Sequence, residues 1–173
     1  MEFFDVVRAR RSIRAYEKRD VEPEKLEKIL ACANAAPSAG NLQGYGILVV
    51  RDEAKRKALR RAALDQPQLT EAPVVLAFLG DAARSGRKYG RRGETLYSLQ
   101  DATIACAYAQ LAATALGLAT CWIGAYDDAE VSRILGLSKG LVPVALLPVG
   151  YAAESPAPTP RRALDDLVKW GQS

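Results

Sequence analysis

The chain of 173 residues contains no histidine and only three cysteines. Because histidine is the commonest general base at neutral pH and the commonest ligand of transition metals, its absence excludes serine–histidine and cysteine–histidine catalysis and argues against a metal centre. An odd number of widely separated cysteines also argues against a disulfide framework. If the chain is an enzyme, we therefore expect no catalytic side chain and no metal ion, but a bound cofactor that carries the chemistry.

Two common phosphate-binding patterns are also absent: the Gly-x-Gly-x-x-Gly turn of dinucleotide folds and the Gly-x-x-x-x-Gly-Lys phosphate loop. No secretory leader is visible, since Glu2 and Asp5 interrupt the apolar N-terminal stretch. We therefore expect a reducing, cytoplasmic setting. The residues between Asp101 and Asp127 are uncharged and numerous enough to span a bilayer. They include Gln110 and Gly117, so we expect a buried core helix and no membrane partner.

The net charge of +4 and a sequence pI near 9.0 favour anionic ligands. The basic residues fall into separate clusters rather than into a stripe interleaved with aromatic residues, which is the pattern of many nucleic-acid-binding proteins. We therefore expect no nucleic-acid partner. A basic binding protein without redox activity remains the alternative from a different functional class.

Hydrophobic periodicity and turn residues predict a mixed α/β layered structure formed by one domain spanning residues 1–173. No linker or internal repeat divides it. The predicted helices cover 2–8, 21–36, 52–63, 96–116, a segment starting at 127, and 163–170. The predicted strands cover 47–50, 73–79, 120–124 and 142–150, with a loop at 37–41, a surface excursion at 80–93 and an extended tail at 151–160.

The segment Arg10-Arg11-Ser12-Ile13-Arg14 places three guanidinium groups and a hydroxyl within five residues. Guanidinium groups bind phosphate oxygens in pairs, and a serine hydroxyl can donate to a remaining oxygen. The segment is therefore a candidate phosphate clamp. The same cations after a short helix also suit the negative end of the helix dipole and can remain solvated.

Several separated motifs, taken together, resemble the nitroreductase family of FMN-dependent oxidoreductases, in its compact prokaryotic form. The matching stretches occur in the family's order and span nearly the whole chain. They are residues 10–16, 36–43, 88–93, 116–125, and 143–150 followed by 160–164.

The resemblance implies an α+β fold of three layers, with a central, mostly antiparallel sheet flanked by helices. It also implies an intertwined homodimer with FMN at the subunit interface, in which the uncharged helix lies against the partner subunit. The implied activity takes hydride from NADH or NADPH and reduces a nitroaromatic, a quinone or a similar small acceptor in ping-pong order. Members of the same fold that dehydrogenate azolines or remove halogens remain alternatives, because FMN-binding motifs do not distinguish these reactions.

By the resemblance, three parts of the chain contact FMN. The N-terminal cluster and a C-terminal arginine pair are implied to contact the phosphate and the ribityl chain. Among these arginines, Arg11 and Arg162 are the most easily explained as solvated or ion-paired. The usual second serine of the ring-binding loop is replaced by Ala39, and the usual Pro-Trp that follows it by Gly44-Tyr45. The implied contacts are Arg10, Arg11, Ser12, Arg14, Arg161 and Arg162 at the phosphate, Pro37, Ser38, Ala39, Asn41 and Gln43 from the other subunit, and Ile123 and Gly124 along the ring.

The excursion at 82–99 is short, which suggests an open site and a broad range of acceptors. Its Arg87, Lys88, Arg91 and Arg92 can attract an anionic substrate or the phosphate of a nicotinamide cofactor, or can simply be solvated. Cys32, Cys106 and Cys121 are predicted to pack in the core rather than to react.

Overall fold

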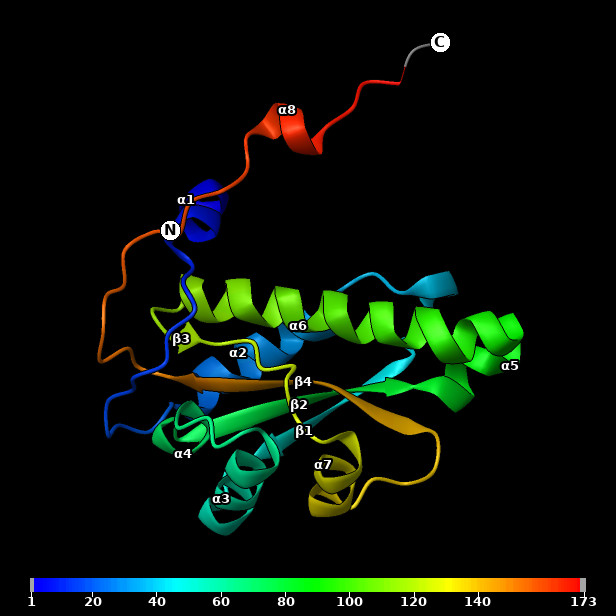
Figure 1. The fold of residues 1–173 in the computed structure, drawn as a ribbon, viewed down its shortest axis with the longest axis horizontal. Helices are drawn as coiled ribbons and strands as arrows, with labels where there is room; N and C mark the ends of the chain where they lie inside the picture. The colour runs from blue at the N-terminus through cyan, green and yellow to red at the C-terminus, as the bar shows by residue number, and fades with distance from the viewer. Residues whose placement is uncertain (1, 172–173) are drawn as a thin grey trace.

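The structure is a computed structural model that describes residues 2–171. A four-stranded sheet with the order β1-β2-β4-β3 forms its centre, and all three strand pairings are antiparallel (Figure 1). The strands are β1 (Tyr45–Val50), β2 (Val74–Asp81), β3 (Ala119–Thr120) and β4 (Leu141–Gly150). The helices are α1 (Phe3–Ala9), α2 (Pro23–Asn34), α3 (Glu53–Ala62), α4 (Gln68–Glu71), α5 (Ala82–Arg92), α6 (Ser98–Ala115), α7 (Asp128–Leu135) and α8 (Leu164–Leu167), with a 3-10 turn at Ala39–Asn41 and a π-helical turn at Gly93–Tyr97.

Helices cover both faces of the sheet, so its central strands are apolar throughout rather than alternating. On β2, Val74, Leu76 and Phe78 pack with α2 and α6, whereas Val75, Ala77 and Leu79 face the layer of α3, α4 and α7. Figure 1 shows α2 and α6 on one side of the sheet and α3, α4 and α7 on the other. The predicted three-layer α+β fold with an antiparallel sheet is confirmed.

The segment after α1 is tied to the edge of the sheet by long-range backbone pairing. Ser12 forms a parallel bridge with Thr120, and the Ile13 amide donates to the Thr120 carbonyl at 3.0 Å. Tyr16 then bridges Ala152, where the chain leaves β4. The N-terminal segment and the start of the C-terminal tail therefore lie together on one side of β3.

Four local predictions from sequence are wrong. Residues 80–93 are largely helical, because Asp81 caps α5 by accepting from the Arg84 amide at 2.9 Å. The strand predicted at 120–124 pairs only through Thr120 and again at Ile123, because Pro148 lies opposite the next position and has no amide hydrogen to donate. The terminal helix shortens to α8, whose residues are exposed and gain nothing from packing. Cys32 is exposed on α2, whereas Cys106 and Cys121 are buried as predicted.

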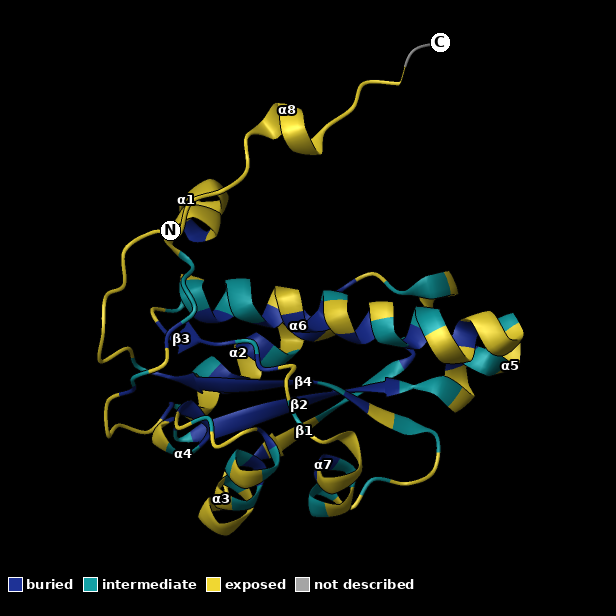
Figure 2. Ribbon diagram, in the orientation of Figure 1, coloured by how far each residue is buried: buried dark blue, intermediate teal, exposed yellow. Residues whose placement is uncertain are grey.

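Burial falls off sharply beyond the sheet (Figure 2). The sheet and the inner face of α6 are buried, but the tail from residue 152 to residue 171 is exposed throughout. In the part of the chain that the structure describes, no helix combines the length and the apolar character needed to cross a membrane.

Candidate FMN site

A cavity of about 560 Å³ lies where the N-terminal segment meets the C-terminal tail. The chain turns out of α1 at Arg10, whose amide still donates to the Val6 carbonyl at 3.0 Å. The chain then runs extended beside Thr120. In an extended segment, successive side chains point to alternate sides. The lining consists of Val7, Arg8, Arg10, Arg11, Ser12, Arg14, Pro156, Ala157, Pro158, Thr159 and Arg161.

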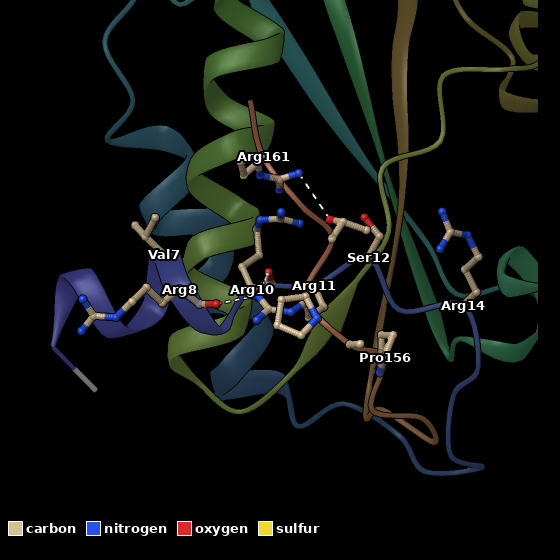
Figure 3. Close-up of a pocket in the computed structure, with 11 residues that line it drawn as sticks. Val7, Arg8, Arg10, Arg11, Ser12, Arg14, Pro156 and Arg161 are labelled. Carbon is tan, nitrogen blue, oxygen red and sulfur yellow. Dashed lines mark hydrogen bonds between the residues drawn. The ribbon is translucent and has the colours of Figure 1, made fainter. Parts of the chain in front are cut away.

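The arginines of this cavity differ in their partners. Arg8 forms an ion pair with Asp5 at 2.6 Å, and Arg11 donates to the carbonyl oxygens of Arg8 and Arg10. Within residues 2–171, the guanidinium groups of Arg10 and Arg14 have neither a hydrogen bond nor an ion pair. In Figure 3 the side chains of Arg10 and Arg161 extend into the space beside Ser12, whereas Arg8 points away and Arg14 projects on the other side of Ser12.

Arg161 reaches this cavity although it lies about 150 residues further along the chain. Glu154 anchors the tail by accepting from the amides of Arg14 and Ala15, at 2.5 and 3.2 Å. Two prolines, Pro156 and Pro158, then stiffen the segment that carries Arg161, whose Nη1 donates to Thr159 Oγ1 at 3.3 Å. The result is a group of cations with no carboxylate among the lining residues, which is suited to an anion.

Arg162 does not line the cavity. Its Nη2 donates to the Asp166 carbonyl at 2.9 Å and therefore caps α8. Thr159 lines the cavity and was not among the residues expected from sequence. A lone threonine in a proline-rich segment carries no signal that would have found it.

Ile123 and Gly124 lie at the end of the stretch that begins with Thr120, the residue paired with Ser12. Ile123 is buried and exchanges two backbone hydrogen bonds with Leu146, at 3.0 and 2.9 Å, whereas Gly124 is exposed. Four extended residues span at most about 13 Å. The strand end and the arginine cavity therefore lie on the same side of the protein, within reach of one elongated ligand.

The loop at 37–43 lies elsewhere and has an unusual backbone. Gly40, Asn41 and Gln43 all have positive φ, at 55°, 55° and 47°. The Gln43 amide donates to Ser38 Oγ at 2.9 Å, and Gln43 Nε2 donates to the carbonyl and side-chain oxygens of Asn41, at 3.0 and 2.7 Å. This arrangement leaves the Gln43 side-chain oxygen and the Asn41 side-chain NH₂ available to an outside ligand.

A buried carboxylate, Asp101, holds this loop in place. Its side-chain oxygens accept from the amides of Ala39 and Gly44, at 2.9 and 3.1 Å, and the residue is only 2% exposed. α6 continues directly from the π-helical turn at Gly93–Tyr97, so these two backbone amides, and not a helix N-terminus, compensate the carboxylate. Sequence reasoning used Asp101 only as the boundary of the uncharged run and missed its role. The available signal was that it is the only charged residue of α6.

The loop and the arginine cavity stand at opposite ends of α6. Pro37, Ser38 and Ala39 line a cavity of about 570 Å³ with side chains from the N-terminal half of α6, among them Gln100, Thr103 and Ile104. Thr114 and Gly117, at the other end of α6, line a smaller cavity that shares Arg10 and Arg11 with the arginine cavity. The 18 residues of α6 rise about 27 Å. One chain therefore does not bring the two groups of residues together.

Two titratable groups near the arginine cavity, the Cys121 thiol and the Tyr16 hydroxyl, are unsuited to acid–base chemistry at neutral pH. Burial raises the pKa of the Cys121 thiol, and the nearby negative charge of Glu154 acts in the same direction. Burial also raises the pKa of the Tyr16 hydroxyl far above neutral pH. Both groups remain protonated and act as packing residues.

Comparison with known proteins shows the family to which this chain belongs. Residues 7–70 and 60–151 match the profile of the Nitroreductase family. A Thermus thermophilus protein named NADH dehydrogenase is 34% identical over 93% of this chain and 92% of its own length, and a Bacillus subtilis FMN reductase is 33% identical over 87% and 66%. The solved structure of B. megaterium NfrA2 superposes with a TM-score of 0.90 at 30% identity, covering 98% of this chain and 74% of its own. The chain belongs to the nitroreductase family.

Proposed function

We propose that the protein is an FMN-dependent oxidoreductase that takes hydride from NADH or NADPH and reduces small acceptors such as nitroaromatics or quinones. The observation that carries this proposal is the cavity with Arg10, Arg14 and Arg161, whose lining includes no carboxylate. The names of relatives, an FMN reductase and an NADH dehydrogenase, support the same chemistry.

The residues fit the phosphate of FMN. A phosphate dianion leaves water at low cost only when cations and hydrogen-bond donors replace its hydration. Arg10 and Arg161 supply two guanidinium groups beside the Ser12 hydroxyl, and Arg14 adds a third positive charge. Arg11 and Arg162 donate hydrogen bonds to backbone carbonyls, so we assign them no direct contact with the phosphate.

We further propose that the site is completed by a second copy of the chain. The outer face of α6 has no charged side chain and exposes Thr103, Ala107, Tyr108 and Ala115. A two-fold axis across this face would set two α6 helices antiparallel. The 37–43 loop of one subunit would then lie at the arginine cavity of the other subunit. This pairing brings together two groups of residues that a single chain holds at opposite ends of α6.

FMN, when bound, supplies the transfer of two electrons from nicotinamide to acceptor, in ping-pong order. The side-chain amides of Asn41 and Gln43 offer donors and an acceptor to the polar edge of the ring. Gly124 presents bare backbone, which allows close approach without a side chain in the way. The protein's part is therefore to bind, orient and limit access, which suits a chain without histidine.

The test is the absorption spectrum of the purified protein. We expect a flavin band, restored by FMN after stripping and bleached by NADH or NADPH without oxygen. Arg10→Ala with Arg14→Ala should raise the Kd of FMN on the order of 100-fold, because two charge-assisted contacts are lost.

The matched control is Lys55→Ala with Arg61→Ala, two exposed cations of α3. Arg56 is unsuitable as a control because it donates to the carbonyls of Thr70 and Ala72, at 2.8 and 2.7 Å. A protein that cannot be reconstituted with FMN, or equal FMN loss in both double variants, would overturn the proposal.

A further inference from the structure

α5 presents a basic face toward the loop at 37–43. Arg84, Arg87 and Lys88 have the spacing i, i+3, i+4, which places them on one side of the helix. All three are exposed. Two more cations, Arg91 and Arg92, follow the break in the helix at Gly90, where φ is 55°.

In the described part of the chain, the cations of this face form no ion pair with a carboxylate. Cations on α1, α2, α3 and α7 pair with acidic residues three or four positions away. None of the ion pairs among residues 2–171 involves a cation of α5. The one acidic residue in the segment 82–97, Glu94, lies against Gly86 and forms no ion pair. Like charges at this spacing destabilise a helix, so the cluster costs stability unless an anion binds to it.

The basic face stands beside the loop that is assigned to the flavin ring. Arg84 Nε donates to the Leu42 carbonyl, which fixes this arginine as a link between α5 and the loop. A Cβ placed on Gly40 would lie only 2.8 Å from Lys88 Nζ, so the ammonium group stands directly over the loop. Arg92 Nε donates at 2.9 Å to the hydroxyl of Tyr97, which lines the adjoining cavity.

Resting on the proposed function, we propose that Arg87 and Lys88 bind the 2′-phosphate of NADPH and make NADPH the preferred hydride donor over NADH. The two donors differ only in this phosphate monoester, a dianion whose oxygens match a guanidinium and an ammonium group. Arg84 is not assigned to the phosphate because its Nε is engaged by the loop.

The first test measures binding without turnover. Calorimetry compares 2′,5′-ADP with 5′-AMP, which lacks the 2′-phosphate, on the FMN-loaded protein. We expect 2′,5′-ADP to bind about tenfold more tightly or better, with a difference that shrinks as salt is added. Arg87→Gln with Lys88→Gln should abolish the difference, whereas Lys55→Gln with Arg61→Gln on α3 should leave it intact.

The second test measures kcat/KM for each donor with menadione, an uncharged acceptor. Arg87→Gln with Lys88→Gln should lower the value for NADPH by about tenfold or more and change the value for NADH by less than about twofold. Equal losses for both donors, or no loss, would overturn the proposal.

An anionic acceptor would meet the same cations, so NADH is also assayed with anthraquinone-2-sulfonate. A charge effect confined to that acceptor would refute the assignment to NADPH. Failure of the proposed function itself would look different, since neither donor would then bleach the flavin.

Discussion

We expect Asp101 to contribute both to the stability of the protein and to its affinity for FMN, although it lies at the other end of α6 from the arginine cavity. Its carboxylate accepts two backbone amides, from Ala39 and Gly44, and is 2% exposed. In Asp101→Asn one oxygen becomes an NH₂ group that faces a backbone amide instead of accepting from it. One hydrogen bond to a charged group is worth about 1.5–3 kcal/mol, and a buried amide left without a partner costs about 1–3 kcal/mol.

Because these two estimates overlap in part, we expect Asp101→Asn to lower the free energy of unfolding by about 2–4 kcal/mol. The assay is urea unfolding followed by circular dichroism, with the m-value checked for an unchanged transition. The FMN affinity should fall in parallel, because the amides that Asp101 holds belong to the loop of Ser38 and Gln43.

Asp127→Asn is the matched control, since Asp127 also accepts a backbone amide, that of Glu130 at 2.9 Å, but at an exposed helix N-terminus. Asparagine caps a helix about as well as aspartate, so the control should change stability by less than about 0.5 kcal/mol. Equal effects of the two substitutions would refute the reasoning that burial and double acceptance make Asp101 costly to replace.

The same buried corner and a surface network supply two further predictions. A Cβ at Gly44 would lie 2.0 Å from the unpartnered hydroxyl of Ser85, so Gly44→Ala should destabilise the protein and Ser85→Ala should relieve part of that loss, as a double-mutant cycle in urea would measure. The pKa of Glu22 is lowered from 4.5 to about 2, chiefly by the hydrogen bond from the Tyr151 hydroxyl and further by the charges of Lys25 and Arg19, so this contribution to stability is present above pH 4.5 and is lost as the pH falls through 2. Tyr151→Phe should therefore lower the melting temperature at pH 6, and its difference from the unsubstituted protein should shrink steadily as the pH falls from 4.5 to about 2; a constant difference across that range would contradict it.

The sheet and its covering helices were predictable because their signals are local. Continuous apolar runs predicted β2 and β4 within one or two residues, and the uncharged stretch after Asp101 predicted α6. The strand at 120–124 failed for a non-local reason. Whether it pairs depends on Pro148, which lies far along the chain and cannot donate.

The sequence did not predict α5 as a helix because its composition is unfavourable for one. Glycines at 86 and 90 and a run of cations are poor helix signals, and the Asp81 cap and the contact of Arg84 with Leu42 outweigh them. The Asp81 cap is local, but Arg84 and Leu42 are 42 positions apart, and no short window of the sequence contains both of these partners.

The arginine cluster shows how far sequence can carry a site and where geometry must take over. The residue types at 10–14 predict an anion, and the sequence already makes Arg11 the arginine most easily explained without a ligand. The fold supplies the physical reason, because Arg11 donates to two carbonyls whereas Arg10 has no partner among the described residues. Arg161 and Arg162 each make one hydrogen bond and are separated by position instead, because only Arg161 lines the cavity. A guanidinium group that already donates to backbone oxygens is held in place by them and is less free to turn toward a phosphate, so the free donors of Arg10 mark the ligand side of the cluster more sharply than the motif does.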